Sequence, residues 1–379
     1  MQLQLDKFYE YCQNWKLTVN VNKTKILIFS RGRQPANLKF HYNNLEVEIV
    51  NEFTYLGVIF SRFGTFNATK KYLINKATKA MYDVLKKGRT HNLSIQCQLD
   101  LFDKIVVPIL LYGCEVWGIG KNDDIERVHL KFCKLLLRLK TSTPNFMVYG
   151  ELGRYPLDIC IKSRILSYWT KLLNGKQSKL STILYKMSFS KTQGNYPSKW
   201  MKYVKNILDT SGYSNFWNSQ QVPNFNWFLK SIRLRLIDQF KQHWKSEVDT
   251  SPKGISYRLF KDEINFENYL KFLQDRDLYV FCKFRTQNHK LPIEIGRWQN
   301  IERNERLCNL CRNVIGDEFH YILECSSLIE ERKNHISRKF ISNPNIIKFG
   351  NLFKSTKQSE IRKLCSFIRI ILEKTSSPC

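Results

Sequence analysis

The sequence predicts an α+β protein that is mostly α, and three observations lead to this fold class. Apolar and polar residues alternate through much of residues 17–60, a pattern typical of strands. From residue 68 onward, apolar residues recur at intervals of three and four, which is typical of amphipathic helices. Near the C-terminus, cysteines and a histidine have the spacing of metal ligands. We therefore expect a small N-terminal β-hairpin region, a helical middle domain, and a helical C-terminal domain that contains a small zinc-binding unit.

Length and charge bound the classes of function. The chain has 379 residues, and its 61 Lys/Arg against 33 Asp/Glu give a formal charge of +28. Hydrophobic residues make up 43%, enough for a sizeable core, so a disordered chain is excluded. Positive charge spread along a folded body favours a polyanionic partner, most often nucleic acid. The most apolar stretch, residues 105–114, is too short to cross a bilayer. The sequence opens on an amphipathic pattern and not on a secretion signal. We therefore expect no membrane partner.

Cysteine usage indicates the redox environment. The chain has eleven cysteines, an odd number, and most stand singly in apolar contexts. This pattern favours a reducing compartment over a disulfide framework. We expect an intracellular protein, in the nucleus or the cytoplasm, whose oligomeric state the sequence leaves open.

The N-terminal elements come first in chain order. The first fifteen residues carry apolar side chains at intervals of four and three, which predicts a helix. Residues 26–29 are continuously apolar and predict a strand. Residues 38–60 predict a hairpin with its turn at Asn43 and Asn44, because asparagine tolerates the positive φ that such a turn needs.

The clearest helix begins at Asp123, which together with Glu126 fits a capping box. Apolar residues then share one face as far as residue 139. Four cations at spacings of four, three and four fall on the opposite face: Arg127, Lys131, Lys134 and Arg138. They fit the solvated face of an ordinary amphipathic helix. They also fit a surface that follows a phosphate backbone, and both interpretations stay open at this point.

Residues 159–208 contain ten basic residues and no acidic one. Lys162 and Arg164 in this segment are candidates for phosphate contacts. Aromatic residues are interleaved with these cations, as in proteins that bind single-stranded nucleic acid, although we expect at least half of the rings to be core. These aromatic residues are Tyr168, Trp169, Tyr185, Phe189, Tyr196, Trp200 and Tyr203.

The rest of the chain divides at one polar segment. Residues 210–229 are uncharged and rich in Ser, Asn and Gln, which predicts a linker or irregular loop. Helical spacing resumes near residue 228, and a last amphipathic helix covers residues 361–372. The domains we expect are 1–66, 67–209, the linker 210–229, a helical region 230–300, the metal-binding unit 301–330, and C-terminal helices 331–379.

The strongest local motif is C-x2-C-x8-H-x4-C, formed by Cys308, Cys311, His320 and Cys325. Four ligands of these types can close a tetrahedron around Zn²⁺, with a turn at residues 316–317 inside the loop. No coordination position is left for water, so the predicted zinc is structural. The eight-residue loop is longer than in retroviral zinc knuckles, so we do not assume that fold.

No catalytic constellation is found. Asp123 and Asp124 form the only adjacent pair of aspartates, as two-metal nucleotidyl transfer needs, but they open a helix and we interpret them as a cap. Phosphate-binding glycine loops, H-E-x-x-H and G-x-S-x-G are absent from the sequence.

Five motifs in order give the chain a family resemblance. It resembles, over nearly its whole length, the C-terminal part of the reverse transcriptases encoded by LINE-type, non-LTR retrotransposons. Residues 15–25 look like the helix and strand that follow the polymerase aspartates, and residues 53–57 look like the primer grip. Residues 110–117 and 149–156 look like thumb and post-thumb helices, and residues 284–298 with the Cys/His cluster look like the terminal zinc-binding region.

The resemblance implies where nucleic acid lies. Phe53, Tyr55, Leu56 and Gly57 are then expected to contact it, and Lys23 corresponds to the family's lysine near the incoming triphosphate. The resemblance makes residues 1–66 the edge of the palm and residues 67–209 the thumb with a basic post-thumb region.

In this family the Y-x-D-D hairpin that holds catalytic Mg²⁺ precedes the first of these motifs, so it is expected before Met1. Mg²⁺ is therefore expected only in the complete parent enzyme, and we expect no polymerase activity from this chain alone.

Three hypotheses follow. The chain is a truncated relative of the polymerase that binds RNA or RNA/DNA hybrid, or part of a complete RNA-directed DNA polymerase, or a host-retained binding or scaffold protein.

Overall fold

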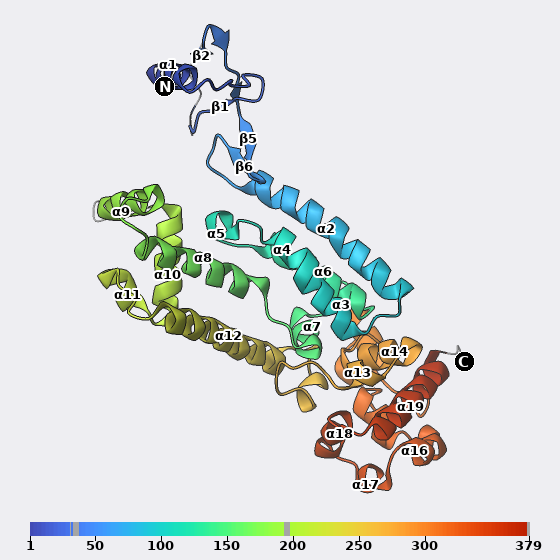
Figure 1. Cartoon of the computed structure of the whole chain (residues 1–379). Helices are drawn as coiled ribbons and strands as arrows, with labels where there is room; N and C mark the ends of the chain where they lie inside the picture. The colour runs from blue at the N-terminus through green and yellow to red at the C-terminus, as the bar shows by residue number, and fades with distance from the viewer. Residues whose placement is uncertain (31, 33–37, 193–197, 377–379) are drawn as a thin grey trace.

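The computed structural model describes residues 1–30, 32, 38–192 and 198–376. The chain runs from a small N-terminal region with short strands, through long helices stacked side by side, to a C-terminal group of shorter helices (Figure 1). The predicted fold class, α+β and mostly α, is confirmed.

The N-terminal region contains one helix and three two-stranded sheets. The turn at Asn43 and Asn44 forms as predicted, with φ of 46° and 63°. The single hairpin predicted over residues 38–60 is wrong, because the segment is divided into two antiparallel hairpins, β2–β3 and β5–β6, and the strand between them, β4, pairs in parallel with β1. The elements are α1 (Gln2–Asn14), β1 (Ile26–Leu27), β2 (His41–Tyr42), β3 (Leu45–Glu46), β4 (Ile49–Val50), β5 (Glu52–Tyr55) and β6 (Val58–Ser61).

This region has its own small core. Ile26, Tyr42 and Val47 are buried in it, with half-buried side chains from α1 packed around them. The predicted helix over the first fifteen residues is confirmed, but of its residues only Cys12 is buried.

Long helices build the middle of the molecule. Helix α2 packs on α4 and α6, α6 packs on α8, and α8 packs on α12, so the long helices lie in successive layers (Figure 1). Pro108 lies in the first turn of α4, directly after the π-helical segment, and it has no N–H to donate to the preceding turn. The helices are α2 (Asn67–Thr90), α3 (Ile95–Leu101), a π-helical segment (Phe102–Val106), α4 (Val107–Leu110), α5 (Cys114–Trp117), α6 (Asp123–Leu136), α7 (Asn145–Leu152), α8 (Leu157–Leu173), α9 (Leu180–Thr192), α10 (Lys199–Ser211), α11 (Ser214–Ser219) and α12 (Phe225–Thr250).

The C-terminal group follows α12. The predicted last helix is confirmed as α19, whose apolar face is buried from Ile361 to Ile371. The helices are α13 (Tyr269–Phe272), α14 (Asp275–Arg285), α15 (Pro292–Trp298), α16 (Ile329–His335), α17 (Arg338–Ile341), α18 (Ile346–Phe353) and α19 (Gln358–Ser376), with short helical turns at Tyr257–Leu259, Arg303–Glu305, His320–Glu324 and Ser326–Leu328.

One apolar core joins the middle and C-terminal helices, extending along the chain from Leu73 to Ile371. Residues 210–229, expected to be a linker or irregular loop, instead contain α11 and the first turn of α12. Trp217 explains the difference, because its ring is buried beside Trp169 and so fixes this polar segment on the body.

Two sequence motifs meet at a buried ion pair. Arg285 in α14 contacts Glu151 in α7 through Nε at 2.9 Å and Nη2 at 3.0 Å, although 134 residues separate them. Arg285 also contacts Glu267 at 3.1 Å and the carbonyl of Phe353 at 3.1 Å. Tyr269 donates its hydroxyl to Glu151 at 2.7 Å. This cluster holds the middle and C-terminal helices together.

Two further features bear on the sequence predictions. The ten cysteines in the described part are all free thiols. Among the described residues, no helix is both long and apolar enough to cross a membrane.

Candidate metal centre and basic surface

The predicted metal ligands come together at one point. Cys308 and Cys311 lie in a tight turn that an isolated bridge between Leu307 and Ile315 closes. His320 and Cys325 flank a helical turn, with the N–H of Cys325 donated to the carbonyl of His320 at 2.8 Å. The ligand atoms of all four residues lie within 4.8 Å of one another.

The distances fit a tetrahedral ion. Zinc–sulfur bonds of about 2.3 Å place two thiolates about 3.8 Å apart on a tetrahedron. The Sγ atoms of Cys308 and Cys325 are 3.8 Å apart, and Sγ of Cys311 is 3.4 Å from Nε2 of His320. The other ring nitrogen of His320, Nδ1, is buried without a hydrogen-bond partner, and the Glu324 carboxylate is 3.9 Å from it. The Cys3His cluster could therefore hold a metal such as zinc.

One thiol of the cluster favours the thiolate. Burial raises the pKa of Cys308, but hydrogen bonds from His320, from the backbone at Cys311 and from Tyr321 outweigh burial and lower the pKa to about 5. A thiolate at neutral pH is the form that binds a metal ion.

Supporting groups around the cluster hold the ligands in place. Arg332, which is only 4% exposed, donates to the carbonyl of Cys325 at 2.7 Å and to that of Ile322 at 2.9 Å. Asp317 accepts the backbone N–H of His320 at 3.0 Å. Gly316 leaves room at the turn, because a Cβ there would be 2.9 Å from Cα of Cys308. The turn at residues 316–317 was predicted from the sequence, whereas only the fold reveals the role of Arg332, because Arg332 lies outside the motif.

The predicted basic stripe is only partly on its helix. Arg127 and Lys131 are exposed on α6, and Lys134 is half-buried with Nζ donated to the carbonyl of Thr141 at 2.8 Å. Arg138 is not on the helix, because α6 ends at Leu136 and Arg138 has φ of 51°. Its guanidinium lies 3.9 Å from the ring centre of Tyr279.

The start of α6 also differs from the prediction. The capping box does not form: Asn122 is the N-cap, without a side-chain cap bond, and Asp123 and Asp124 lie in the first turn. Glu126 turns inward, where it accepts the hydroxyl of Tyr149 and the backbone N–H of Leu157, each at 2.7 Å.

A second basic stripe, on α2, has more charge than the one on α6. The helix contains seven Lys/Arg and one acidic residue, Asp83. Its buried face runs through Leu73, Ala77 and Met81, so the cations gather on the outer face. The side chains of Tyr72 and Tyr82 are exposed on the same outer face. The exposed cations of the α2 face are Lys71, Lys76, Lys79, Lys86, Lys87 and Arg89.

The two stripes are neighbours. Helices α2 and α6 pack against each other, and Nζ of Lys131 on α6 lies 5.2 Å from the ring centre of Tyr82 on α2. The run of lysines in residues 70–89 was the signal available in the sequence, and the apolar positions between them show which side faces outward.

The β5–β6 hairpin packs against α2. Its turn at Leu56 and Gly57 has φ of 47° and 79°, and Tyr112 donates its hydroxyl to the carbonyl of Leu56 at 2.9 Å. Tyr55 and Leu56 are exposed, whereas Phe53 and Gly57 are half-buried. A cavity of about 460 Å³ under the turn is lined by Leu56, Gly57, Tyr72, Leu73, Lys76, Pro108, Ile109 and Tyr112.

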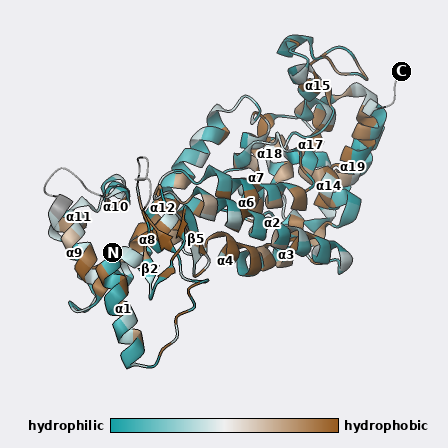
Figure 2. Cartoon of the chain, turned by 90° about the horizontal axis from the view of Figure 1, so that it is seen from above, coloured by the Kyte–Doolittle hydropathy of each residue, from teal (hydrophilic) through white to brown (hydrophobic). Residues whose placement is uncertain are grey.

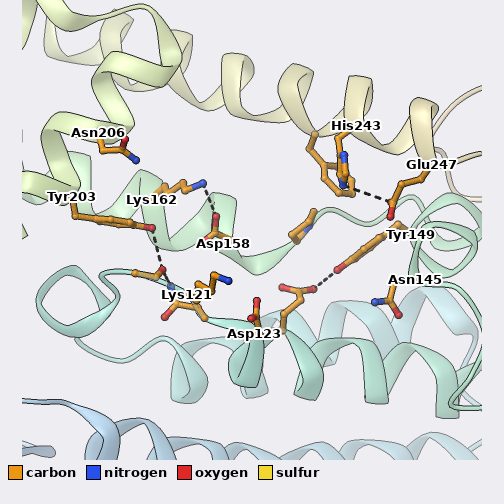
Figure 3. A pocket seen from close by; sticks show the side chains of 15 residues that line it. Lys121, Asp123, Asn145, Tyr149, Asp158, Lys162, Tyr203, Asn206, His243 and Glu247 are labelled. Carbon is orange, nitrogen blue, oxygen red and sulfur yellow. Dashed lines mark hydrogen bonds and ion pairs between the residues drawn. The ribbon is translucent and has the colours of Figure 1, made fainter.

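The other cations that the sequence predicted as nucleic-acid contacts, Lys23, Lys162 and Arg164, do not lie on α2 or α6. Lys23 is exposed in a turn, where its backbone N–H is donated to Oδ1 of Asn20 at 3.1 Å. Arg164 donates to the carbonyl of Leu111 at 3.0 Å. Lys162 pairs with Asp158 at 2.7 Å and points into a cavity of about 590 Å³ (Figure 3). The same cavity is lined by the carboxylates of Asp123, Glu126, Asp158 and Glu247, so it does not extend the basic surface.

The described aromatic rings among those interleaved in residues 159–208 lie in the core or pack against it. Trp169 is fully buried and donates Nε1 to the hydroxyl of Tyr185 at 2.9 Å. Trp200 donates Nε1 to the carbonyl of Glu115 at 2.8 Å. The six described rings are buried or half-buried, which confirms the expectation that at least half are core, and they offer no stacking platform. Tyr196 lies outside the described residues.

The fold and site define a mostly helical protein with a Cys3His cluster and a basic helical face. Known proteins similar to it come from mobile elements. It is 22% identical over 158 residues to an RNA-directed DNA polymerase from mobile element jockey of Drosophila melanogaster, covering 41% of this chain and 17% of the polymerase. The corresponding jockey polymerase of Drosophila funebris is 23% identical over 151 residues, covering 39% of this chain and 16% of the polymerase.

A third relative is much shorter. An uncharacterized Caenorhabditis elegans protein, described as transposon-derived, is 23% identical over 225 residues, covering 54% of this chain and 78% of that protein. No protein-family model matches the chain, and no solved structure matches it.

These relatives confirm the resemblance to LINE-type, non-LTR retrotransposon reverse transcriptases. The chain is related to a part of such polymerases, since the matched region spans less than a fifth of the length of either jockey polymerase.

Proposed function

We propose that this chain binds nucleic acid, RNA or RNA/DNA hybrid, along the α2 face and the adjoining residues of α6 and the β5–β6 hairpin. The observation that carries this proposal is the α2 face itself, where six exposed cations share one side of a single helix with one acidic residue. Phosphates recur along a nucleic-acid backbone, so a row of cations at helical spacing can neutralise several at once.

The exposed side chains beside the cations support this surface. Tyr72 and Tyr82 on α2 and Tyr55 at the hairpin offer rings 40%, 47% and 59% exposed, on which a base or sugar can pack. The cavity under the hairpin turn contains Lys76 and Tyr112 in its lining, without a carboxylate. The similar polymerases act on RNA and DNA by name, which agrees with a nucleic-acid partner.

Salt dependence tests the proposal. Binding of a labelled 20-base-pair RNA/DNA hybrid should weaken steeply with salt, with a log–log slope of about −0.9 for each phosphate neutralised. The variant Lys79→Ala/Lys86→Ala should bind more weakly and flatten the slope by about two.

The control is Lys333→Ala/Lys354→Ala, which removes the same charge elsewhere, from side chains paired with Glu330 and Asp262. It should leave the slope unchanged. Equal slopes for all three proteins would mean that the α2 face does not bind the backbone. Tighter binding of duplex DNA than of hybrid would contradict the assignment to RNA.

We also propose that Cys308, Cys311, His320 and Cys325 hold a structural zinc ion. The support is the donor set and its spacing, which leave no ligand position for water. The ion would stabilise the turn that joins α15 to α16. Metal analysis should find about one zinc per chain, and Cys308→Ser should lose the zinc together with folding of the C-terminal helices. Protein that is zinc-free yet fully folded would disprove the site.

A further inference from the structure

Helix α9 presents a ridge of aliphatic side chains to solvent. Leu180, Ile183, Leu184 and Met187 follow one another at helical spacing, and they are 68%, 39%, 52% and 53% exposed. We name these four residues the α9 ridge. In Figure 2 the helix lies at the edge of the molecule, away from the C-terminal helices, and parts of its ribbon are coloured as apolar.

The opposite face of α9 is anchored to the body. Tyr185 is buried, and its hydroxyl contacts Nε1 of Trp169 and the side chain of Gln220. Phe189 packs edge-on against Trp217, with ring centres 5.6 Å apart. Thr182 is also buried. The orientation of the helix is therefore determined by its inner face, which leaves the ridge outward.

Charge around the ridge has one sign. Lys176 and Lys179 just before α9 and Lys186 within it are exposed, and Lys179 and Lys186 flank the same edge of the ridge. No acidic residue occurs between residues 159 and 208 of the sequence. An aliphatic strip beside unneutralised ammonium groups is complementary to a helix that carries leucine-like residues on one face and carboxylates next to them.

We propose that the α9 ridge binds an acidic amphipathic helix of a partner protein. Aliphatic side chains do not provide the flat rings on which nucleobases stack, so the ridge differs in chemistry from the α2 face. A second copy of this chain would bring the same lysines against each other, which disfavours a symmetric α9 pairing. The proposal stands independently of nucleic-acid binding.

The experiment uses two designed peptide probes and the full chain. The first is an 18-residue helical peptide with leucine at every third or fourth position and glutamate on both flanks, and the second replaces every glutamate with lysine. Fluorescence anisotropy should show binding of the acidic peptide only. Leu184→Gln/Met187→Gln should weaken that binding by about tenfold or more, because both side chains lose their apolar contact.

A charge reversal tests the complementarity directly. Lys176→Glu/Lys179→Glu/Lys186→Glu should reverse the preference, so that the lysine peptide binds more tightly than the glutamate peptide. The matched control is Ile346→Gln/Ile347→Gln, which replaces two aliphatic side chains of α18 that are 58% and 74% exposed. It should leave the binding of both peptides unchanged. The circular dichroism spectrum and thermal unfolding of the Leu184→Gln/Met187→Gln variant should equal those of the unmodified chain, which shows that the variant is folded.

Three results would overturn the proposal. The first is equal binding of both peptides, or acidic-peptide binding that survives Leu184→Gln/Met187→Gln. The second is binding of phosphatidylcholine/phosphatidylserine vesicles that the same variant abolishes while neither peptide binds, which would make the ridge a membrane contact. The third is sedimentation showing a dimer that the same variant dissociates.

Discussion

Replacing Arg285 with methionine should destabilise the whole helical body, because Arg285 compensates the buried carboxylate of Glu151 and the half-buried carboxylate of Glu267. The side chains of Arg285 and Glu151 are 1% and 0% exposed. The guanidinium donates to Glu151 and to the carbonyl of Phe353, and it forms an ion pair with Glu267. In Arg285→Met the carboxylate of Glu151 retains the hydroxyl of Tyr269, and Glu267 retains Lys261, but one positive charge is lost from the cluster.

The expected cost follows from that loss. Removing one partner of a buried ion pair costs about 3–5 kcal/mol, since the remaining charge is uncompensated. The double variant Arg285→Met/Glu151→Leu removes the charge on both sides of the pair, so its cost should be smaller than the sum of the two single variants by about 2 kcal/mol. Packing alone does not predict this non-additivity.

Urea unfolding followed by tryptophan fluorescence measures the free energy of unfolding of all the variants. The control is Arg276→Met, which breaks an ion pair with Glu373 at 3.1 Å whose side chains are 70% and 62% exposed. It should cost less than about 1 kcal/mol. A cost for Arg285→Met as small as for Arg276→Met, or strict additivity in the double variant, would refute the reasoning.

Three further predictions concern acid, the hairpin and the metal centre. Burial raises the pKa of Glu151, but Arg285 and Lys261 outweigh burial and hold the pKa below its ordinary range. The contribution of Glu151 to the free energy of unfolding should therefore be complete above the unfolded pKa of about 4.3, and it should fall as the pH drops through the lower pKa of the folded state. Acid unfolding followed by circular dichroism measures this dependence. Gly57→Ala should cost about 1–2 kcal/mol of stability in thermal unfolding, because the residue has φ of 79° and its new Cβ would lie 3.2 Å from Cε1 of Tyr112. Gly212→Ala is the control, because Gly212 has φ of 83° but no atom within 4 Å of the new Cβ, so it measures the cost of the backbone conformation alone. Equal costs for the two variants would show that the contact with Tyr112 contributes nothing. Arg332→Met should weaken zinc binding about tenfold in a chelator competition, since Arg332 holds the carbonyl of Cys325, and an unchanged affinity would show that the turn needs no such support.

Local signals predicted the elements that depend on near neighbours. The mostly helical class, the turn at Asn43 and Asn44, and the last amphipathic helix follow from spacing or from the φ preference of one residue type. The four metal ligands lie within eighteen residues of one another, so their convergence needs only one turn and one helical segment.

The errors arose where distant residues decide the outcome. Glu126 has the position of a capping residue, but the hydroxyl of Tyr149 and the N–H of Leu157 draw it inward. The polar segment 210–229 contains α11 instead of an irregular loop, because Trp217 packs on Trp169. Arg138 leaves the stripe because α6 ends two residues earlier.

The sequence by itself determined the charge, the helical content and the Cys3His motif, because these depend on composition and short spacing. Only the tertiary structure decided which cations are exposed together: it placed the α2 face beside α6, buried Trp169 and Tyr185, and left the other described rings that alternate with cations in residues 159–208 half-buried against the core. The physical reason is that a side chain's exposure depends on what packs against its helix. Those packing partners come from residues far away in the chain.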